Sequence, residues 1–236
     1  MKIGLAVYEF RNNDIEFNLR QIEKALENAR GKVDLLCFSE TFLQGFDALT
    51  WEYGHDRQVA VSRDSETMAR LCAMTEQYQT DLLFGYIEKD GEALYSSCAV
   101  ISDGRIIHNY RRITRGWKEY SITDGHYQEG TDTAAFEYFG RKIRIALCGD
   151  LWDCPEQFMT EDLLIWPVYV SYSLEEWEEA VPEYAEQAGS VSRKTLLVNA
   201  ISKDPDAHGG AFVFEGSTVA ARLPFDQESI LIAECE

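Results

Sequence analysis

Basic residues are scarce in this sequence. Lys and Arg number 22 against 41 Asp and Glu, so the formal net charge is −19. A chain this acidic repels the phosphates of nucleic acids and the anionic surface of a membrane. We therefore expect neither nucleic acid nor a membrane among its partners.

Long apolar segments are also missing. No uninterrupted apolar stretch is long enough to span a bilayer, and the first residues do not form an apolar signal segment with a cleavage site. The six cysteines are scattered, and two of them, Cys37 and Cys98, lie inside apolar runs. Without an export signal, this distribution predicts reduced thiols and a cytoplasmic location, not a disulfide framework.

Metal-ligand spacing is not found either. The closest cysteine pair, Cys148 and Cys154, has no matching second pair, and no histidine lies at ligand spacing from it. We therefore predict that the protein has no metal site.

No linker rich in Pro, Gly or Ser divides the chain, so we predict one domain over residues 1–236. Helical periodicity alternates with apolar runs of strand length. One predicted helix follows a cap at Asn13 or Asp14. The other predicted helices cover 65–79 and 173–190. The predicted strands cover 2–8, 33–40, 81–89, 93–102, 105–112, 143–148, 162–170, 195–202, 210–216, 217–223 and 229–235. This order predicts an α/β fold with helices on the outer faces of sheets.

One cysteine stands at an unusual place in "IRIALCGDLWDCPE" (143–156). Cys148 ends an apolar strand, and Gly149 and Asp150 follow at once. Most cysteines in apolar strands are small core residues. A side chain at such a turn is instead lifted to the sheet edge, and the N–H groups just after it can bind an oxyanion. The position favours a nucleophile, which needs a base because a free thiol is mostly protonated at pH 7.

A second strand offers that base. "LLCFSETFLQGF" (35–46) brings Glu40 to the carboxyl end of an apolar strand, the edge where ligands bind in α/β folds. A Glu at this point can also be a solvated or capping residue. Partial burial would raise the pKa of Glu40 and make it a useful general base.

A third strand supplies cations. "IIHNYRRITRGWKEY" (106–120) contains Arg111, Arg112, Arg115 and Lys118. Basic residues at a strand exit are usually solvated. A cation beside a thiolate and a developing oxyanion would stabilise both.

Taken in order, these segments resemble the nitrilase superfamily of carbon–nitrogen hydrolases. "FSETFLQGF" resembles the family's Glu motif, "GRIIHNYRR" its lysine segment and "ALCGDLWDCPE" its Cys motif. Later stretches, "LLIWP", "SVSRKTLLVNA" and "HGGAFVF", also resemble family landmarks. The resemblance covers essentially the whole chain and implies a four-layer αββα sandwich.

The resemblance implies a Glu–Lys–Cys triad with Glu40 as base and Cys148 as nucleophile. It implies hydrolysis of a small carboxamide through a cysteine thioester, with release of ammonia and without an organic cofactor. The N–H of Gly149 would help to hold the oxyanion. Hydrolysis of a nitrile or an N-carbamoyl compound is a further alternative.

The chain departs from the family at the lysine. Where the family has Tyr-Arg-Lys, this sequence reads Tyr110-Arg111-Arg112. A guanidinium stays charged and is larger than an ammonium, so it can hold an oxyanion but cannot easily exchange a proton. Lys118 is the first candidate to replace the lysine, and Arg112 is the second. If neither does, the protein is a catalytically impaired member that binds a small molecule or another protein.

The loop between the second and third motifs supplies further candidates. Many family members use a second acid there, which maps best onto Asp124 and alternatively onto Glu119. Aromatic residues on the motif-bearing loops are candidates to line a substrate pocket, although such residues also pack in ordinary cores. They are Phe42, Trp117, Tyr127 and Trp152. The family's usual packing implies a homodimer through helices near 155–160 and 173–190.

Overall fold

Two six-stranded sheets form the middle of the computed structural model, which describes residues 1–235. The first sheet has the order β12-β1-β2-β3-β4-β5. Its strands β1, β2 and β3 are parallel, and antiparallel strands complete both sides. The bounds are β1 (Lys2–Val7), β2 (Leu35–Cys37), β3 (Asp81–Asp90), β4 (Ala93–Ser102), β5 (Arg105–Arg111) and β12 (Ser229–Glu234).

The second sheet repeats this plan with the order β11-β10-β9-β8-β7-β6. Strands β7, β8 and β9 are parallel, and the strands outside them are antiparallel. The bounds are β6 (Phe136–Tyr138), β7 (Arg141–Ile145), β8 (Thr160–Pro167), β9 (Ser192–Lys203), β10 (Asp206–Glu215) and β11 (Thr218–Arg222).

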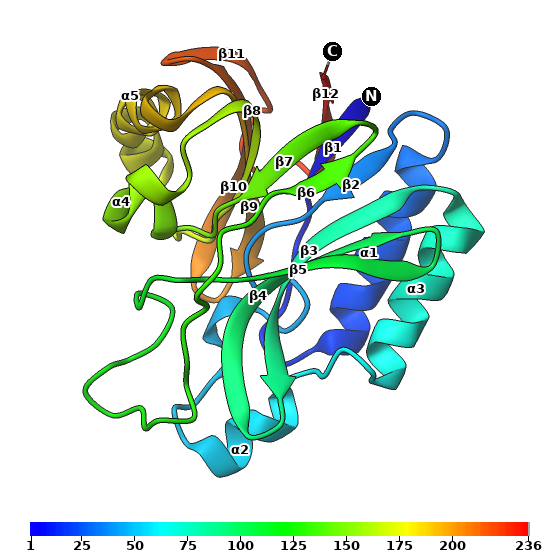
Figure 1. The fold of residues 1–236 in the computed structure, drawn as a ribbon, viewed down its shortest axis with the longest axis vertical. Helices are drawn as coiled ribbons and strands as arrows, with labels where there is room; N and C mark the ends of the chain where they lie inside the picture. Colours follow the sequence, from blue (N-terminus) through cyan, green and yellow to red (C-terminus); the bar gives the residue numbers. More distant parts are fainter. Residues whose placement is uncertain (236) are drawn as a thin grey trace.

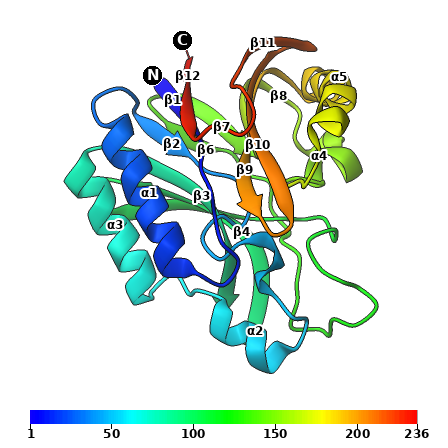
Figure 2. The same cartoon turned by 180° about the vertical axis from the view of Figure 1, so that it is seen from behind.

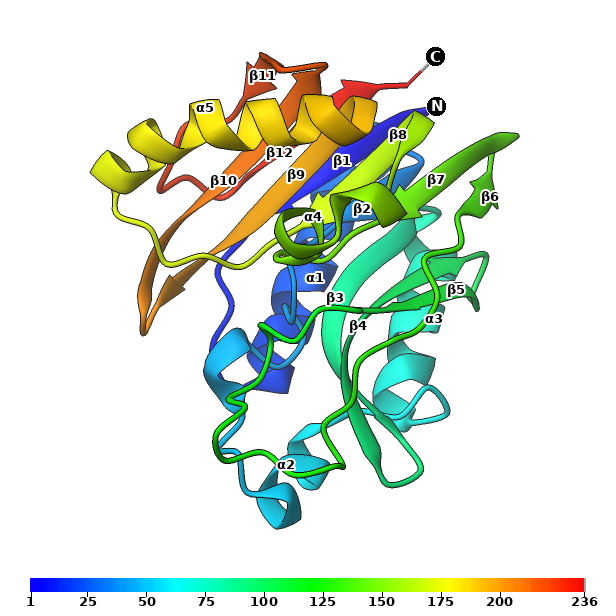
Figure 3. The same ribbon diagram turned by 60° about the vertical axis from the view of Figure 1, so that its left-hand side comes forward.

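Helices cover the outer face of each sheet, which gives four layers (Figures 1 and 2). Helices α1 (Ile15–Ala29) and α3 (Glu66–Tyr78) lie side by side on the first sheet. Helix α5 (Leu174–Val191) lies across β9 and β10 of the second sheet (Figure 3). The predicted αββα sandwich is confirmed.

The core between the sheets is apolar because the parallel strands are buried on both faces. Ile3, Leu5 and Val7 of β1 pack in the same cluster as Ile143 and Ile145 of β7. A second cluster joins the first sheet to α1 and α3. The sheets are also tied by the main chain, since the Phe10 N–H donates to the Ile201 carbonyl at 3.0 Å.

Local signals placed the helix starts correctly. Asp14 caps α1 by accepting the N–H of Phe17, and Ser65 caps α3 by accepting the N–H of Met68. Helix α5 begins with a capping box in which Ser173 and Glu176 bond reciprocally.

Several predicted elements differ from the structure in their bounds, and three of these differences lie near the motifs. The predicted strand 33–40 ends at Cys37, and the strand 143–148 ends at Ile145, because the chain turns where Thr41 and Cys148 adopt positive φ. The helix expected near 155–160 is a short 3-10 helix, Pro155–Gln157, since β8 already begins at Thr160 to pair with β9.

Two short helices were not predicted. They are α2 (Tyr53–Val59) and α4 (Asp150–Asp153), and α4 starts two residues after Cys148. A long segment, 112–135, joins β5 to β6 and runs past α2 (Figure 3). The side chain of Tyr127 anchors it there by donating to buried Asp56 at 2.6 Å.

Within residues 1–235, no helix is long and apolar enough to cross a membrane. Trp152 of α4 is exposed, and so are Met159 and Leu174 on the segments 155–160 and 173–190. The homodimer through these two segments and the cytoplasmic location stay predictions.

One glycine controls how the chain leaves β2. A Cβ built on Gly85 of β3 would lie 2.4 Å from the Thr41 nitrogen and 2.6 Å from the Glu40 Cα. These are backbone atoms, so they cannot turn aside. The missing side chain of Gly85 lets the segment with Glu40 cross β3 closely.

We expect Gly85→Ala to destabilise the fold by about 1–3 kcal/mol, the usual cost of overpacking. Urea unfolding measures this change. Gly54→Ala is the control, because its Cβ meets no atom within 4 Å and alanine favours the helix α2 by up to about 1 kcal/mol. Equal stability of both variants would contradict the close approach.

Candidate active site

The parallel strand β2 determines where Glu40 lies. Glu40 follows the last residue of β2 by three positions and has no exposed surface. Its N–H donates to the Val168 carbonyl at 3.3 Å, so the segment after β2 meets the end of β8 in the other sheet. The Glu40 carboxylate therefore lies where the carboxyl ends of the two sheets' parallel strands meet.

Cys148 reaches the same edge from the second sheet. It follows the end of β7 by three positions, as Glu40 follows β2. Its N–H donates to the Pro167 carbonyl at 3.0 Å, its carbonyl accepts the indole N–H of Trp166 at 2.9 Å, and its φ is +44°. A positive φ is uncommon for a residue with a side chain. These bonds hold the turn, in which Cys148 as a residue is half-buried.

Arg112 completes the group. It follows β5 directly, and its side chain is only 3 % exposed. Its Nη1 donates to Oε1 of Glu40 at 3.0 Å, and Ser96 Oγ donates to the same oxygen at 3.0 Å. The other carboxylate oxygen, Oε2, is buried and has no hydrogen-bond partner among residues 1–235.

A second carboxylate fixes Arg112 indirectly. Arg112 Nε donates to Thr114 Oγ1 at 3.0 Å, and Thr114 Oγ1 donates to Asp150 at 2.8 Å. Asp150 is fully buried and also accepts the Tyr110 hydroxyl at 2.5 Å and the Leu147 N–H at 2.9 Å. Asp150 thus links the strand that carries Arg112 to the turn that carries Cys148.

The charges of this group act on the thiol. Burial and the Glu40 carboxylate raise the pKa of Cys148 to about 12, and the Arg112 guanidinium opposes that rise. Burial alone would lower the pKa of Arg112, but Glu40, Cys148 and Asp150 outweigh it and raise that pKa. At neutral pH the thiol is therefore protonated and Arg112 is charged.

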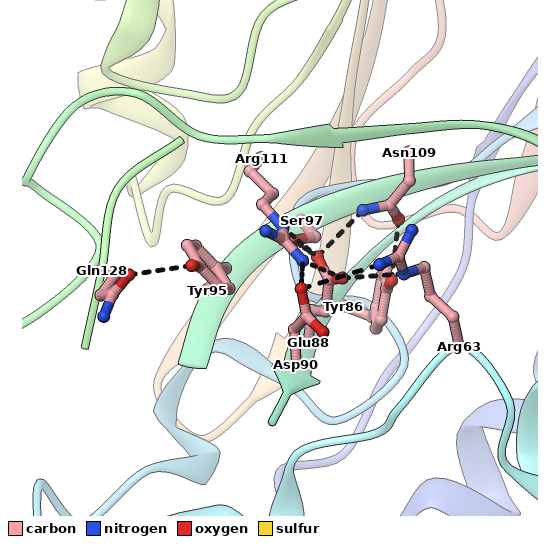
Figure 4. A network of polar contacts seen from close by, with 9 residues as sticks. All are labelled: Arg63, Tyr86, Glu88, Asp90, Tyr95, Ser97, Asn109, Arg111 and Gln128. Carbon is pink, nitrogen blue, oxygen red and sulfur yellow. Dashed lines mark hydrogen bonds and ion pairs between the residues drawn. The ribbon is translucent and has the colours of Figure 1, made fainter. Parts of the chain in front are cut away.

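A separate network holds the other face of the same strands (Figure 4). Buried Glu88 of β3 accepts Arg111 Nε at 2.9 Å, Ser97 Oγ at 2.6 Å and Asn109 Nδ2 at 2.9 Å, and Arg63 Nε lies 3.1 Å away. Although burial raises the pKa of Glu88, these hydrogen bonds lower it below its usual value. This Glu88 network fixes the end of β5 just before Arg112.

Lys118, the first candidate for the missing lysine, lies elsewhere. Its Nζ is 2.6 Å from Oε1 of Glu129 and donates to the Tyr127 carbonyl. These contacts hold the loop after β5 together. Of the two predicted cations, the structure brings Arg112 to Glu40 and Lys118 to Glu129.

The two loop acids have local partners. Asp124 accepts the backbone N–H of His126 at 3.0 Å, and its side chain is more than half exposed. Hydrogen bonds from the N–H and the ring of His126 lower the pKa of Asp124. Glu119 is exposed and accepts the hydroxyl of Ser121 at 2.7 Å.

Three of the four predicted pocket aromatics are buried in cores. Phe42 has no exposed surface, with its ring 4.6 Å from that of Phe38. Trp117 and Tyr127 belong to the segment 112–135 and pack in a small apolar cluster with Ile87 and Leu94. Trp152 is exposed on α4, edge-on to Tyr184.

The structure thus brings together Glu40, Cys148, Arg112 and Gly149, all from the motifs. Sequence reasoning did not single out Ser96 and Thr114. Thr114 stands two positions after Arg112, which is a usable signal, whereas Ser96 is revealed only by the pairing of β4 with β5. Among residues 1–235, no three His, Cys, Asp or Glu side chains cluster as metal ligands would.

Comparison with known families agrees with this geometry. The sequence profile of the carbon–nitrogen hydrolases matches residues 2–187. This chain belongs to the carbon–nitrogen hydrolase family. The matched range contains Glu40, Arg112 and Cys148, so the resemblance seen in the motifs is confirmed.

Curated relatives are distant. A glutamine-dependent NAD(+) synthetase of Acinetobacter baylyi is 23 % identical over 99 % of this chain, and the match covers 44 % of that protein. An (R)-stereoselective amidase of a Pseudomonas species is 26 % identical over 66 % of this chain and 54 % of its own length. The chain thus spans about half the length of these relatives.

Solved structures share the fold of this hydrolase family member. An amidase of the nitrilase superfamily from Nesterenkonia sp. AN1 superposes with a TM-score of 0.83 at 16 % identity, covering all of this chain and 92 % of that one. A CN-hydrolase superfamily protein of Xanthomonas campestris gives a TM-score of 0.81, also at 16 % identity, and covers 100 % and 90 % of the two chains.

The electrostatics predict that the charge of Glu40 slows the alkylation of Cys148. Glu40→Gln removes the negative charge that raises the thiol pKa, so we expect that pKa to fall by about one unit or more. Iodoacetamide alkylation of Cys148 at pH 8, followed by peptide mass mapping, should accelerate about tenfold, because the thiolate is the reactive form.

Glu156→Gln, at an exposed carboxylate of the same segment, is the matched control and should leave the rate unchanged. In the wild-type chain the alkylation rate should rise steadily from pH 7 to pH 10 without a plateau, since the thiol pKa lies near 12. A slower Glu40→Gln variant would mean that Glu40 promotes alkylation as a base and that its charge is not the dominant effect.

Proposed function

We propose that this chain hydrolyses the C–N bond of a small carboxamide through a thioester on Cys148 and releases ammonia. The observation that carries the proposal is the buried Glu40–Arg112 pair beside the Cys148 thiol. A nucleophile, a base and a fixed positive charge are the groups that acyl transfer from an amide requires.

In the first half of the reaction the Cys148 sulfur attacks the amide carbon. Glu40 accepts the thiol proton, and Oε2 is the oxygen free to do so, since Oε1 already accepts Arg112 and Ser96. The tetrahedral oxyanion is held by the Arg112 guanidinium and the N–H of Gly149. When the intermediate collapses, Glu40 returns the proton to the leaving nitrogen, the C–N bond breaks and ammonia departs.

In the second half, water attacks the thioester. Glu40 removes a proton from the water, a second oxyanion forms in the same place, and the C–S bond breaks. The carboxylic acid leaves, and the thiol of Cys148 is restored with the proton that Glu40 had taken. No other reactant is needed.

Arg112 acts only through its charge in this scheme. A guanidinium does not lose its proton at working pH, so all proton transfer falls to Glu40. This division of roles suits the resting site, in which the thiol is protonated and the carboxylate oxygen that receives the proton is unoccupied.

The relatives support the substrate class. One is named as glutamine-dependent and another as an amidase, so primary carboxamides, with glutamine among them, are the first compounds to test. A further relative is named as an arylacetonitrilase, which keeps nitriles in the set, and N-carbamoyl compounds complete it.

A second function is favoured by the residue at the family's lysine position. Arg112 occupies that position, and a guanidinium cannot easily exchange a proton. A site of this kind can bind a small molecule without turning it over. In that case the chain is a binding module that has kept the family fold.

The deciding experiment measures ammonia release and intact mass for a panel of carboxamides, nitriles and N-carbamoyl compounds, with acid quenching. We expect an acyl adduct on Cys148 and ammonia release that falls at least 1,000-fold in Cys148→Ala and in Glu40→Gln, because each removes a group of the chemical step. Cys154→Ala is the matched cysteine control and should retain activity.

A substrate whose turnover survives in Cys148→Ala would refute the thioester route. Saturable binding of a panel compound, without an adduct or ammonia, would favour the binding module. Lys118→Ala should lose far less activity than Arg112→Ala, and the reverse order would return the cation's role to Lys118.

A further inference from the structure

Two glycines enclose the Arg112 guanidinium. A Cβ built on Gly149 would lie 2.4 Å from Arg112 Nη2, and one built on Gly116 would lie 2.9 Å from the same atom. Both distances are shorter than real Cβ contacts. The Nη2 group therefore fills the space that a side chain at either position would need.

The backbone does not require glycine at these positions. Gly149 has φ −63° and ψ −11°, which any residue adopts, and Gly116 is not among the glycines with positive φ. Among residues 1–235, the atoms that a Cβ on Gly116 would meet within 4 Å all belong to Arg112. The three atoms nearest to a Cβ on Gly149 are Nη2 and Cζ of Arg112 and Thr114 Oγ1, and the last lies at 3.7 Å, an ordinary contact.

Two hydrogen bonds orient the guanidinium. Nη1 is bound to Glu40 and Nε to Thr114, so the planar group is oriented at two of its three nitrogens. The third nitrogen, Nη2, must then point between the loop at Gly116 and the turn at Gly149. A lysine at position 112 would have no atom equivalent to this second amino group.

We infer that Gly116 and Gly149 are positioning residues that let an arginine serve at the lysine position. Because neither glycine has a side chain, they leave a space that holds Nη2 of Arg112, and we call this space the seat of Arg112. In this seat one guanidinium spans the site, with Nη1 on the carboxylate of Glu40 and Nη2 beside the residue that follows the nucleophile. The catalytic meaning of this seat rests on the proposed function, since an oxyanion formed at Cys148 would lie next to Gly149.

An alanine at Gly149 tests the seat without removing a charged group. The obstructing atom is the end of a long side chain, so the guanidinium moves and the fold survives. Arg112 lowers the pKa of the Cys148 thiol, so displacing Arg112 should raise that pKa. Arg112→Lys removes Nη2, and in that background the same alanine has nothing to displace.

The experiment compares four proteins: wild type, G149A, R112K and R112K/G149A. The pH profile of Cys148 alkylation by iodoacetamide is measured for each, together with kcat and KM for ammonia release. We expect G149A to slow alkylation at pH 8 about tenfold or more in the Arg112 background and less than twofold in the Lys background. In ammonia release, G149A should lower kcat more than it raises KM.

G116A provides an independent second variant with the same expected pattern. G125A is the matched control, because Gly125 lies on the same loop, has no positive φ, and its Cβ would meet no atom within 4 Å. It should alter neither readout. Circular dichroism confirms that each variant is folded.

If G149A slows alkylation equally in the Arg112 and Lys backgrounds, the inference that the two glycines position Arg112 is wrong, because the effect of the alanine would then not depend on Nη2. Background-dependent alkylation without ammonia release from any panel compound would support the seat and count against the proposed hydrolysis. Ammonia release with equal losses in both backgrounds would support the hydrolysis and overturn the seat.

Discussion

The buried pair of Glu40 and Arg112 constrains everything around it. Removing one partner of a buried ion pair typically costs about 3–5 kcal/mol, because the other charge is left without compensation. The surrounding residues supply further hydrogen bonds to these two side chains. Ser96 donates to the carboxylate, and Thr114 accepts from the guanidinium and passes the contact on to Asp150. The site therefore exists only where β2, the β4–β5 pair and the turn after β7 meet.

The pleat of β4 and β5 explains how one pair of strands serves two networks. Successive residues of a strand point to opposite faces. Ser96 and Arg112 accordingly face Glu40, while Ser97 and Arg111 face Glu88 (Figure 4). Each network joins a Glu to a Ser of β4 and to an Arg at the end of β5 or directly after it. A slip of β5 by one residue would break both sets together, so the Glu88 network helps to define which arginine enters the site.

Much of the fold could be predicted from local signals, because strand runs, caps and turns are local properties. The positions of Glu40 and Cys148 followed from their places just after apolar strands. The choice between Arg112 and Lys118 could not be made, since the way the loop after β5 folds back, which brings Glu129 and the carbonyl of Tyr127 to Lys118, is not a local property of the sequence. Aromatic residues on loops, such as Phe42, could not be assigned to core or pocket because burial depends on tertiary packing.

The site is divided between the two sheets in a way that bears on folding. Glu40 and Arg112 both belong to the first sheet and can meet once that sheet has formed. Cys148 follows a strand of the second sheet, and the Glu40 charge that helps burial to raise its pKa comes from the first sheet. The titration of this single thiol is therefore a native probe of sheet docking, which distinguishes a chain with two formed halves from a completed sandwich.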